Sequence, residues 1–428
     1  MKTNIFQKLL VTEEEFGKLS EELAAAYPEL IRLGEIGKSQ EGRPIRLFTV
    51  TEFSSGEEKP GFFIQGHIHS KEMSGTLAGL DIIRRLAEDY TPGGILSKAV
   101  FYVIPRCNPD GAERMAQLPG DERSSWGNYT DEINTIERCD LDGDGLSRSI
   151  LYEHPDGEMI RLESDPRCLV GRKPDSKGPF YMLFPEGLFR NFDRDKLKNW
   201  PPFAREYIDW NRNWPVGWSP DQFGNGSAPL SVPEVRLQAD WLKAHPNICG
   251  AIALHNGYGS QMFPPTFEED QAYVKDLGAR AEKFTGHPSL YGKVHGLANS
   301  GPIARGVFDD YCYGELGYLC VVVELGTREN SAGGNSLELF DRPDAYTAPY
   351  EILAQQDADP SLPTCFWDWE EFEHPQLGKV LIGGSCPALF ASPLLDYLEK
   401  VTEGVYHFVL DFLNDSLQGK GVRRAIRK

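Results

Sequence analysis

A short apolar run, a polar loop and an amphipathic segment follow one another near the start of this chain of 428 residues. The apolar run, 62–64, predicts a buried strand. Between residues 76 and 86 the apolar side chains recur at helical spacing. His69 and Glu72 lie in the loop between them, so in a first helical turn they would point from one face. A strand that leads directly into a helix predicts an α/β fold, and such junctions are where α/β folds place their sites.

The same alternation continues along the chain and predicts a single large α/β region. Apolar runs predict strands at 45–50, 61–65, 99–104, 250–254, 320–323 and 379–384. Helical periodicity predicts helices at 12–33, 74–88, 233–245, 267–285 and 391–415. We expect a catalytic domain at residues 1–335 and a C-terminal extension packed on it at residues 336–428.

The imidazole and carboxylate near the first strand can be interpreted in two ways. Most His-x-x-Glu pairs are a solvated ion pair or part of a helix cap. The alternative is that His69 and Glu72 are two ligands of a catalytic zinc ion, which takes three protein ligands and keeps a fourth position for water. His67 is a competing ligand, although alternation along an extended chain would place it on the opposite side.

Two further strands end on side chains that could complete a zinc site. The run 250–254 leads into His255, and the run 320–323 leads into Glu324. Taken singly, His255 fits a hydrogen-bonded core histidine, and Glu324 fits the ion-pair partner of a Lys or Arg. Because ligands bind at the carboxyl ends of parallel strands, we expect both to lie beside the His-x-x-Glu pair. Two histidines and one glutamate would then hold zinc, and Glu324 would act as general base toward the water on it.

A long irregular segment interrupts the α/β pattern between about residues 115 and 205. It is too long for a plain loop, which predicts an insertion with a structure of its own. Asp140, Asp142 and Asp144 alternate as in the first half of a calcium loop, but Leu151 stands where such a loop has a bidentate acid. The two interpretations are an acidic surface turn and a Ca²⁺ site.

Composition excludes several classes of function. A net charge of −20 offers no basic excess for binding nucleic acid. No run approaches the ~20 apolar residues of a membrane span, and the first residues lack the apolar stretch of a signal peptide. The eight cysteines form no Cys-x-x-Cys pair, which predicts free thiols. We therefore expect a cytoplasmic protein with no nucleic-acid or membrane partner.

Five motifs occur in order over about residues 10–330. They are Gly66-x-His-x-His69-x-x-Glu72, Asn108-Pro109-Asp110-Gly111, Asp209-Trp210-Asn211-Arg212-Asn213, Ala251-x-x-x-His255 and Val323-Glu324-Leu325. Their series resembles the zinc carboxypeptidases of the carboxypeptidase A/B type. The resemblance implies an α/β/α sandwich around a mixed, mostly parallel sheet, one Zn²⁺ per chain, and hydrolysis of the C-terminal residue of peptides.

The resemblance also implies roles for particular residues. The zinc ligands would be His69, Glu72 and His255, with Glu324 activating water and then protonating the leaving amine. The terminal carboxylate of the substrate would be clamped by Asn211 and Arg212, since a guanidinium pairs well with a carboxylate. A second arginine polarises the scissile carbonyl in this family. The family's spacing places it at Arg123, with Arg148 as the alternative.

Two departures from the family pattern concern substrate specificity. The family's mobile tyrosine should precede Asp310 by several residues, but 301–306 contains none. In this family one residue lines the pocket for the terminal side chain of the substrate, and the resemblance places it at Asp309. An acidic residue there resembles the carboxypeptidases that prefer basic side chains. The alternatives are a solvent-facing Asp309, or Asp310 in its place. The insertion itself resembles that of bacterial members with Asp-Gly-Asp-Gly loops.

Two other functions stay open at this stage. One is a related zinc amidase that acts on cell-wall peptides or N-acyl amino acids. The other is a non-catalytic binding protein that keeps only the scaffold. The complete set of candidate ligands together with Glu324 favours an enzyme over the binding protein.

Overall fold

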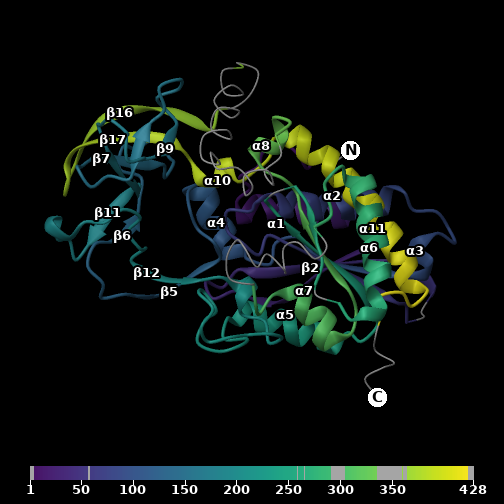
Figure 1. Ribbon diagram of the computed structural model, residues 1–428. Coiled ribbons are helices and arrows are strands. Elements are labelled where there is room, and N and C mark those ends of the chain that lie inside the picture. The colour runs from purple at the N-terminus through teal and green to yellow at the C-terminus, as the bar shows by residue number, and fades with distance from the viewer. Residues whose placement is uncertain are drawn as a thin grey trace.

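The computed structural model has a central seven-stranded sheet with a β-rich arm on one side (Figure 1). It describes residues 4–55, 58–257, 259–264, 266–290, 304–334, 359 and 364–422. The central strands lie in the order β1 (Ile31–Lys38), β2 (Pro44–Val50), β4 (Val100–Ile104), β3 (Gly61–Gly66), β13 (Ile248–His255), β15 (Cys320–Glu324) and β14 (Gln261–Met262). The strands from β4 to β15 run parallel, and antiparallel strands close both edges.

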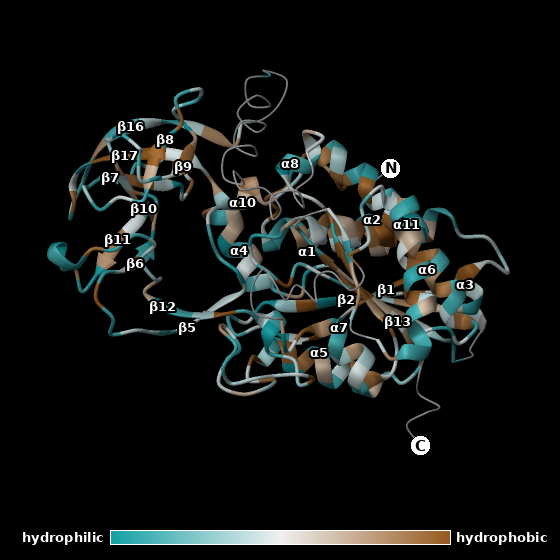
Figure 2. Cartoon of the chain, viewed as in Figure 1, coloured by the Kyte–Doolittle hydropathy of each residue, from teal (hydrophilic) through white to brown (hydrophobic). Residues whose placement is uncertain are grey.

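Helices cover both faces of this sheet. Alternation along β3 shows why, because Phe62 and Ile64 pack in one apolar core and Phe63 packs in the other. The first face carries α1 (Glu13–Ala26), α2 (Ser74–Glu88), α6 (Glu268–Thr285) and α11 (Leu395–Leu417). The opposite face carries α5 (Pro233–Ala244), α7 (Phe308–Tyr311) and the π-helical turn η4 (Cys312–Leu316). Hydrophobic residues gather along the central strands (Figure 2). The predicted α/β/α sandwich is confirmed.

The first helix is shorter than its pattern suggested. The helix predicted at 12–33 ends at Ala26, and Tyr27 leaves helical geometry with φ −135° and ψ 58°. Pro28 follows, and a residue before proline is disfavoured in the helical region. Residues 28–30 of the predicted helix form a turn instead, and residues 31–33 are the first three residues of β1. The helix predicted at 74–88 matches α2.

The insertion forms the arm at the left of Figure 1. It consists of short antiparallel strands, β5 (Ser125–Tyr129), β6 (Thr135–Arg138), β7 (Ser149–Glu153), β8 (Met159–Arg161), β9 (Leu169–Gly171), β10 (Tyr181–Pro185), β11 (Gly187–Arg190) and β12 (Arg205–Ile208). β5 and β12 pair as a two-stranded ribbon that joins the arm to the core. An insertion with its own structure was expected, although no strand in it was predicted.

The C-terminal segment contributes to both the arm and the core. Strands β16 (Phe366–His374) and β17 (Gly378–Ser385) join the arm, where Ile382 pairs with Ile150 of β7. Helix α11 instead packs in the core, with the Phe412 ring 5.3 Å from that of Phe62. The division into a domain at residues 1–335 and an extension at residues 336–428 stays a prediction.

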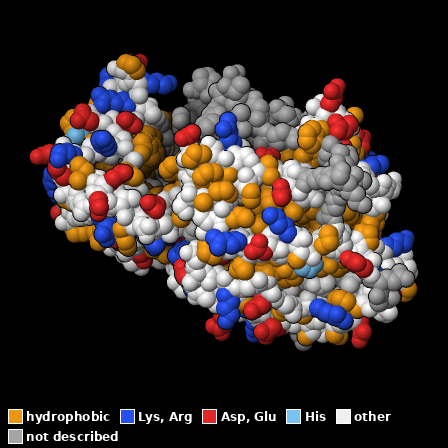
Figure 3. Space-filling view, turned by 90° about the horizontal axis from the view of Figure 1, so that it is seen from below, with side chains coloured by type: hydrophobic (Ala, Val, Ile, Leu, Met, Phe, Trp, Pro, Cys, Tyr) orange, Lys and Arg blue, Asp and Glu red, His pale blue; other side chains and the backbone are white. Residues whose placement is uncertain are grey.

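Shorter helical segments connect these elements. They are η1 (Phe53–Ser55), α3 (Ile95–Lys98), α4 (Pro109–Gln117), η2 (Arg194–Lys196), η3 (Trp210–Arg212), α8 (Arg328–Ser331) and α10 (Pro387–Phe390). All eight cysteines are free, as expected. Among the described helices, none combines the length and apolar character needed to cross a bilayer. Acidic and basic side chains are interspersed on the face shown in Figure 3.

Candidate active site

His69, Glu72 and His255 converge at the carboxyl edge of the central sheet. Glu72 Oε1 lies 2.8 Å from His69 Nδ1, and its Oε2 lies 2.9 Å from His255 Nδ1. The two Nδ1 atoms are 3.2 Å apart, and all three side chains are buried. Burial lowers the pKa of His255, which favours the neutral imidazole that a metal ligand must be. Two imidazole nitrogens and a carboxylate in this arrangement fit the ligand set of a catalytic zinc ion.

Strand register brings these residues together from distant parts of the sequence. His255 of β13 lies beside Glu324 of β15, and the preceding residue of β13 lies beside Gly66 of β3. Helix α2 approaches the end of β3 closely, since a Cβ on Gly66 would lie 2.6 Å from the carbonyl oxygen of Gly75. Glycine at both positions lets the chain turn from strand to helix and place Glu72 over the sheet edge.

Glu324 faces the same edge, and one of its oxygens is not engaged by any described residue. Its side chain is buried, and Oε2 has no hydrogen-bond partner among the described residues. Burial raises the pKa of Glu324 well above its ordinary value, and the charge of Glu72 adds to the rise while Arg123 opposes it. Gly257 leaves room for this carboxylate, because a Cβ there would lie 2.5 Å from Oε2. A buried carboxylate with a raised pKa and a free oxygen is suited to proton transfer.

Asp209 connects a candidate ligand with a candidate catalytic arginine. His69 donates from Nε2 to Asp209 Oδ1 at 3.1 Å, and Arg123 donates from Nε to Asp209 Oδ2 at 3.1 Å. Burial alone would raise the pKa of Asp209, but the charges of Arg123 and His69 outweigh it and hold that pKa well below its ordinary value. A carboxylate behind a metal-binding histidine sets its tautomer and ring orientation.

Of the two arginines considered for the scissile carbonyl, the structure brings only Arg123 to the cluster. Its guanidinium donates to Glu72 Oε1 at 2.5 Å as well as to Asp209. Arg148 lies in the arm, where it pairs with Asp142 at 2.5 Å and with Asp144 at 3.0 Å. The sequence spacing that favoured Arg123 therefore agrees with its position beside the candidate ligands.

The residues predicted to hold the substrate terminus lie next to this cluster. Arg212 donates to the Asn211 carbonyl oxygen at 2.7 Å, and its guanidinium is 3.8 Å from Asp209 Oδ2. Asn211 Oδ1 accepts from the backbone N–H of Phe308 at 2.9 Å, which ties this segment to the start of α7. Asp309 in the first turn of α7 is 1% exposed, so the solvent-facing alternative is wrong. The positions 301–303, where the tyrosine was sought, lie outside the described residues.

Comparison with known proteins identifies the family. A family model described as zinc carboxypeptidase matches residues 18–350. The chain belongs to the zinc carboxypeptidase family. The resemblance seen in the five motifs is confirmed, and the enzyme class they predicted, a zinc metallopeptidase, is that of the family.

Individual relatives match this chain over shorter stretches. Carboxypeptidase B of Astacus astacus is 35% identical over 127 residues, 29% of this chain and 40% of that protein. Carboxypeptidase A2 of Rattus norvegicus is 28% identical over 169 residues, 37% of this chain and 40% of that protein. The matches thus span two fifths of these relatives. The solved structure of thrombin activatable fibrinolysis inhibitor aligns with 98% of this chain and 79% of that chain at TM-score 0.54 and 15% identity, a likeness of fold.

His67 supports the loop that carries the candidate ligands and does not lie in place as a third histidine ligand. Its Nδ1 lies 2.7 Å from Thr76 Oγ1, and its Nε2 lies 3.0 Å from the Ser70 carbonyl oxygen. Burial, together with the charge of Arg106, lowers the pKa of His67 to about 3, so the ring is neutral. It therefore donates from Nε2 to Ser70 and accepts at Nδ1 from Thr76. Both ring nitrogens are engaged, which excludes His67 as a competing ligand in this arrangement.

The structure does not support the calcium site in the arm. Asp140 accepts from the backbone N–H groups of Gly143 and Gly145 at 2.7 and 2.9 Å. Asp142 and Asp144 pair with the same arginine, Arg148. These carboxylates are engaged by the turn itself and by one cation, as in an acidic surface turn. The absence of an acid at the twelfth position, Leu151, agrees with this acidic surface turn.

Sequence reasoning missed the roles of Asp209 and His67. Both stand inside quoted motifs, two residues before a residue that was assigned. Asp209 could have been found, because a carboxylate in a motif that also carries the substrate clamp is a candidate to orient a histidine ligand. His67 was considered only as a ligand, since its left-handed backbone, with φ 60°, is not visible in the sequence.

Proposed function

We propose that this protein is a zinc-dependent carboxypeptidase that releases the C-terminal residue of peptides. The observation that carries the proposal is the buried Glu324 carboxylate at the edge that also holds the two-histidine, one-glutamate cluster, with its Oε2 unengaged among the residues that the structure describes. The ligands would be His69, Glu72 and His255, with one zinc ion per chain. Zinc, when bound, supplies Lewis-acid polarisation of a water molecule and of the scissile carbonyl.

The chain's own residues would bind the substrate, transfer the proton and stabilise the developing charge. Arg212 and Asn211 bind the terminal carboxylate and fix the scissile bond in reach of Glu324. Glu324 removes a proton from the attacking water as the water oxygen bonds to the carbonyl carbon. Arg123 donates to the carbonyl oxygen as negative charge develops on it. Glu324 then delivers the proton to the leaving nitrogen as the C–N bond breaks, which regenerates the carboxylate and releases an amino acid.

Asp309 would select the terminal side chain. It is buried at the start of α7, and Asn211 of the carboxylate clamp is hydrogen-bonded to the residue next to it. A carboxylate at that depth favours a cationic partner over an apolar one. We infer a preference for peptides that end in Lys or Arg.

The test compares one peptide with a free C-terminus and the same peptide amidated there. The purified zinc-loaded protein should release the last residue from the free acid only, because Arg212 needs a carboxylate. Glu324→Gln should retain zinc and lose ~10²-fold or more of kcat, since it keeps the shape but cannot accept a proton. Release would be followed by mass spectrometry, and bound zinc by metal analysis.

Other outcomes would point elsewhere. Equal cleavage of both peptides would favour an amidase or endopeptidase that does not read the free carboxylate. Peptide binding without turnover in the zinc-loaded protein would favour a binding protein on the same scaffold. An unchanged kcat in a zinc-containing Glu324→Gln variant would remove Glu324 from the mechanism.

A further inference from the structure

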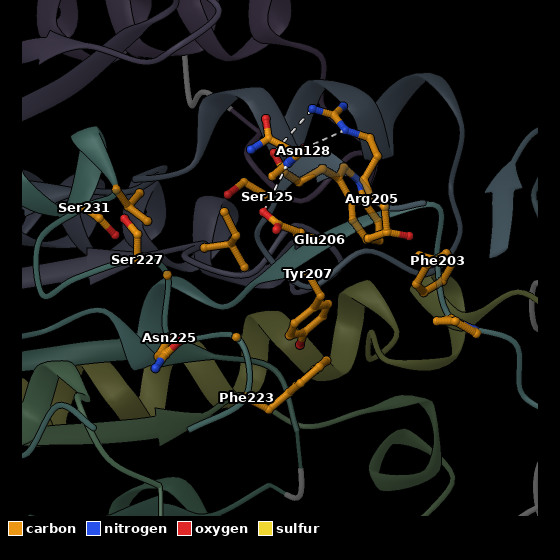
Figure 4. Close-up of a pocket in the computed structure, with 18 of the residues that line it drawn as sticks. Ser125, Asn128, Phe203, Arg205, Glu206, Tyr207, Phe223, Asn225, Ser227 and Ser231 are labelled. Atoms are coloured by element: carbon orange, nitrogen blue, oxygen red, sulfur yellow. Dashed lines mark hydrogen bonds between the residues drawn. The ribbon is translucent and has the colours of Figure 1, made fainter. Parts of the chain in front are cut away.

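A large cavity lies where the arm joins the core. Its volume is about 1080 Å³, and its walls are the β5–β12 ribbon and the loop that precedes α5 (Figure 4). Trp126, Phe203, Tyr207 and Phe223 all line it. None of the residues proposed for catalysis is among its lining residues, so the cavity is a separate feature that the mechanism does not use.

The cavity adjoins the candidate active site through the ribbon itself. β5 begins two residues after Arg123, and β12 ends at the residue before Asp209. On the opposite wall, the Gly224 carbonyl oxygen accepts from the Asp209 N–H at 2.9 Å. A Cβ on Gly224 would lie 3.1 Å from the Tyr207 ring, and the charges of Asp209 and Arg123 act on the Tyr207 phenol. The cavity therefore lies beside the segments that hold Arg123 and Asp209.

Aromatic rings line the cavity in a connected row. Trp126 lies between Phe203 and Tyr207, with ring centroids 4.9 and 6.5 Å away. Phe223 stacks on Tyr207, with ring centroids 5.1 Å apart and 18° between the ring planes. The two side chains lie next to each other in Figure 4. Phe223 is nevertheless 75% exposed. When a ligand covers a large apolar ring that is exposed to water at a cavity wall, the burial of the ring stabilises the complex.

Three charged side chains line the cavity: Arg205 and Glu206 are held by backbone groups of the ribbon, and Glu132 is exposed. Arg205 donates from Nε to the Gly127 carbonyl oxygen at 3.0 Å, and Glu206 Oε2 accepts from the Asn128 N–H at 3.3 Å. Figure 4 shows these contacts on the side of the cavity away from Phe223. Because Arg205 and Glu206 are engaged with backbone groups, the ring faces are the main apolar surface that the cavity offers for recognition. The ligand they suit is an aromatic or aliphatic side chain.

We propose that this cavity is a distal subsite for the part of a peptide substrate that precedes the scissile bond. This inference rests on the proposed carboxypeptidase function. Arg212 and Asp309 would take the terminal residue, so the rest of the peptide must extend on the side of Arg123, which holds the preceding carbonyl. The β5–β12 ribbon leads from there to the aromatic row. The preferred substrates are peptides of several residues with an apolar side chain upstream of the cleaved bond.

The test uses Phe223→Ala, which removes an exposed ring and leaves the core untouched. The matched control is Phe284→Ala, another exposed ring, which is 39% exposed on α6 and outside the cavity lining. Substrates share their last two residues and are a blocked dipeptide, a hexapeptide with upstream Phe or Leu, and the same hexapeptide with upstream Ser. For the apolar hexapeptide, Phe223→Ala should lower kcat/KM about fivefold more than for the dipeptide. Phe284→Ala should change kcat/KM by the same factor for all of these substrates.

Further outcomes separate this inference from the proposed function. Equal losses on dipeptide and apolar hexapeptide, or a loss below twofold, would overturn the subsite. Affinity of the apolar hexapeptide for the zinc-loaded Glu324→Gln variant, measured by calorimetry, tests the subsite without turnover. If the parent cleaves no peptide but this affinity still falls about fivefold with Phe223→Ala, the carboxypeptidase proposal fails while the subsite stands. An unchanged affinity overturns the subsite alone.

Discussion

At the scale of single residues, the loop that carries His69 and Glu72 is held in shape by His67. The backbone of His67 has φ 60°, a left-handed conformation that is costly for a residue with a Cβ. Its ring spans the loop, from the Ser70 carbonyl oxygen to the Thr76 hydroxyl at the start of α2. We infer that these two hydrogen bonds compensate the backbone strain and set the direction in which the next histidine points.

The variant His67→Gly tests the contribution of the His67 ring without introducing backbone strain. Glycine adopts positive φ without strain, but it removes both hydrogen bonds that brace the loop. We expect the affinity for zinc to fall about tenfold, as it does when other supports of metal ligands are removed. Competition with a coloured chelator measures this affinity. His67→Asn, which tolerates the left-handed backbone and keeps a polar side chain, should lose less. Unchanged affinity in His67→Gly would show that the ring only fills space.

A second prediction at this scale concerns Asp309 and the preference for the terminal side chain of the substrate. If its carboxylate binds the terminal side chain of the substrate, the parent should cleave peptides ending in Arg or Lys better than those ending in Leu or Phe. Asp309→Ala should lower kcat/KM for the Arg peptide about 100-fold, because it removes one partner of a buried charge pair. Asp310→Ala, at the half-buried neighbouring position, is the control. A parent that prefers Leu or Phe would rule out this role.

At the scale of elements, α11 is fastened to α6 by charge as well as by apolar packing. Arg280 of α6 pairs with Asp411 and Asp415 of α11, and Lys420 donates to Asp415 at 2.7 Å. Burial alone would raise the pKa of Asp415. The hydrogen bonds and charges of Lys420 and Arg280 outweigh this effect, so its pKa lies below the ordinary value. The pairing fixes the register of two helices that lie far apart in the sequence.

Asp415→Asn should lower the free energy of unfolding by about 1–2 kcal/mol at neutral pH. A carboxylate with a depressed folded-state pKa stabilises the fold above its unfolded pKa of about 4, and the effect is lost as pH falls through the folded value. The difference between parent and variant should therefore shrink below about pH 4. Urea unfolding at several pH values measures it. Asp276→Asn, at the exposed end of the same network, should cost less than about 0.5 kcal/mol. A pH-independent difference would exclude the ionic explanation.

At the scale of the whole molecule, local signals made the core predictable and long-range pairing made the arm unpredictable. The strand and helix around His69 have strong periodicities that tertiary contacts did not override. In the arm, strands of three to five residues carry too little pattern to be recognised. Its sheet includes β17, in which Ile382 pairs with Ile150, a residue far away in the sequence. Such a pairing depends on the folded core, which brings both segments to one place.

The same reasoning applies to the candidate site. Residues at the ends of apolar strands could be placed together, because parallel strands share an edge. The hydrogen bonds of Asp209 and the ring contacts of His67 depend on side-chain directions that no periodicity encodes. Specificity at Asp309 depends on a loop whose preceding residues lie outside the described part of the chain. Sequence alone therefore brought the candidate ligands together but did not reveal the residues that support them.

The last prediction concerns whether the catalytic region can fold without the C-terminal segment. The family match ends at residue 350, yet α11 buries Leu398, Val405, Phe408 and Phe412 in the core. Each such side chain contributes about 1.5–3 kcal/mol when buried. Their sum is comparable to the whole stability of a typical domain, about 5–15 kcal/mol. A chain of residues 1–335 should therefore fail to fold into a protease-resistant, zinc-binding form, whereas a chain of residues 1–422 should behave as the parent. Limited proteolysis and metal analysis measure both. A stable, zinc-binding 1–335 would instead establish the expected division into a domain and an extension.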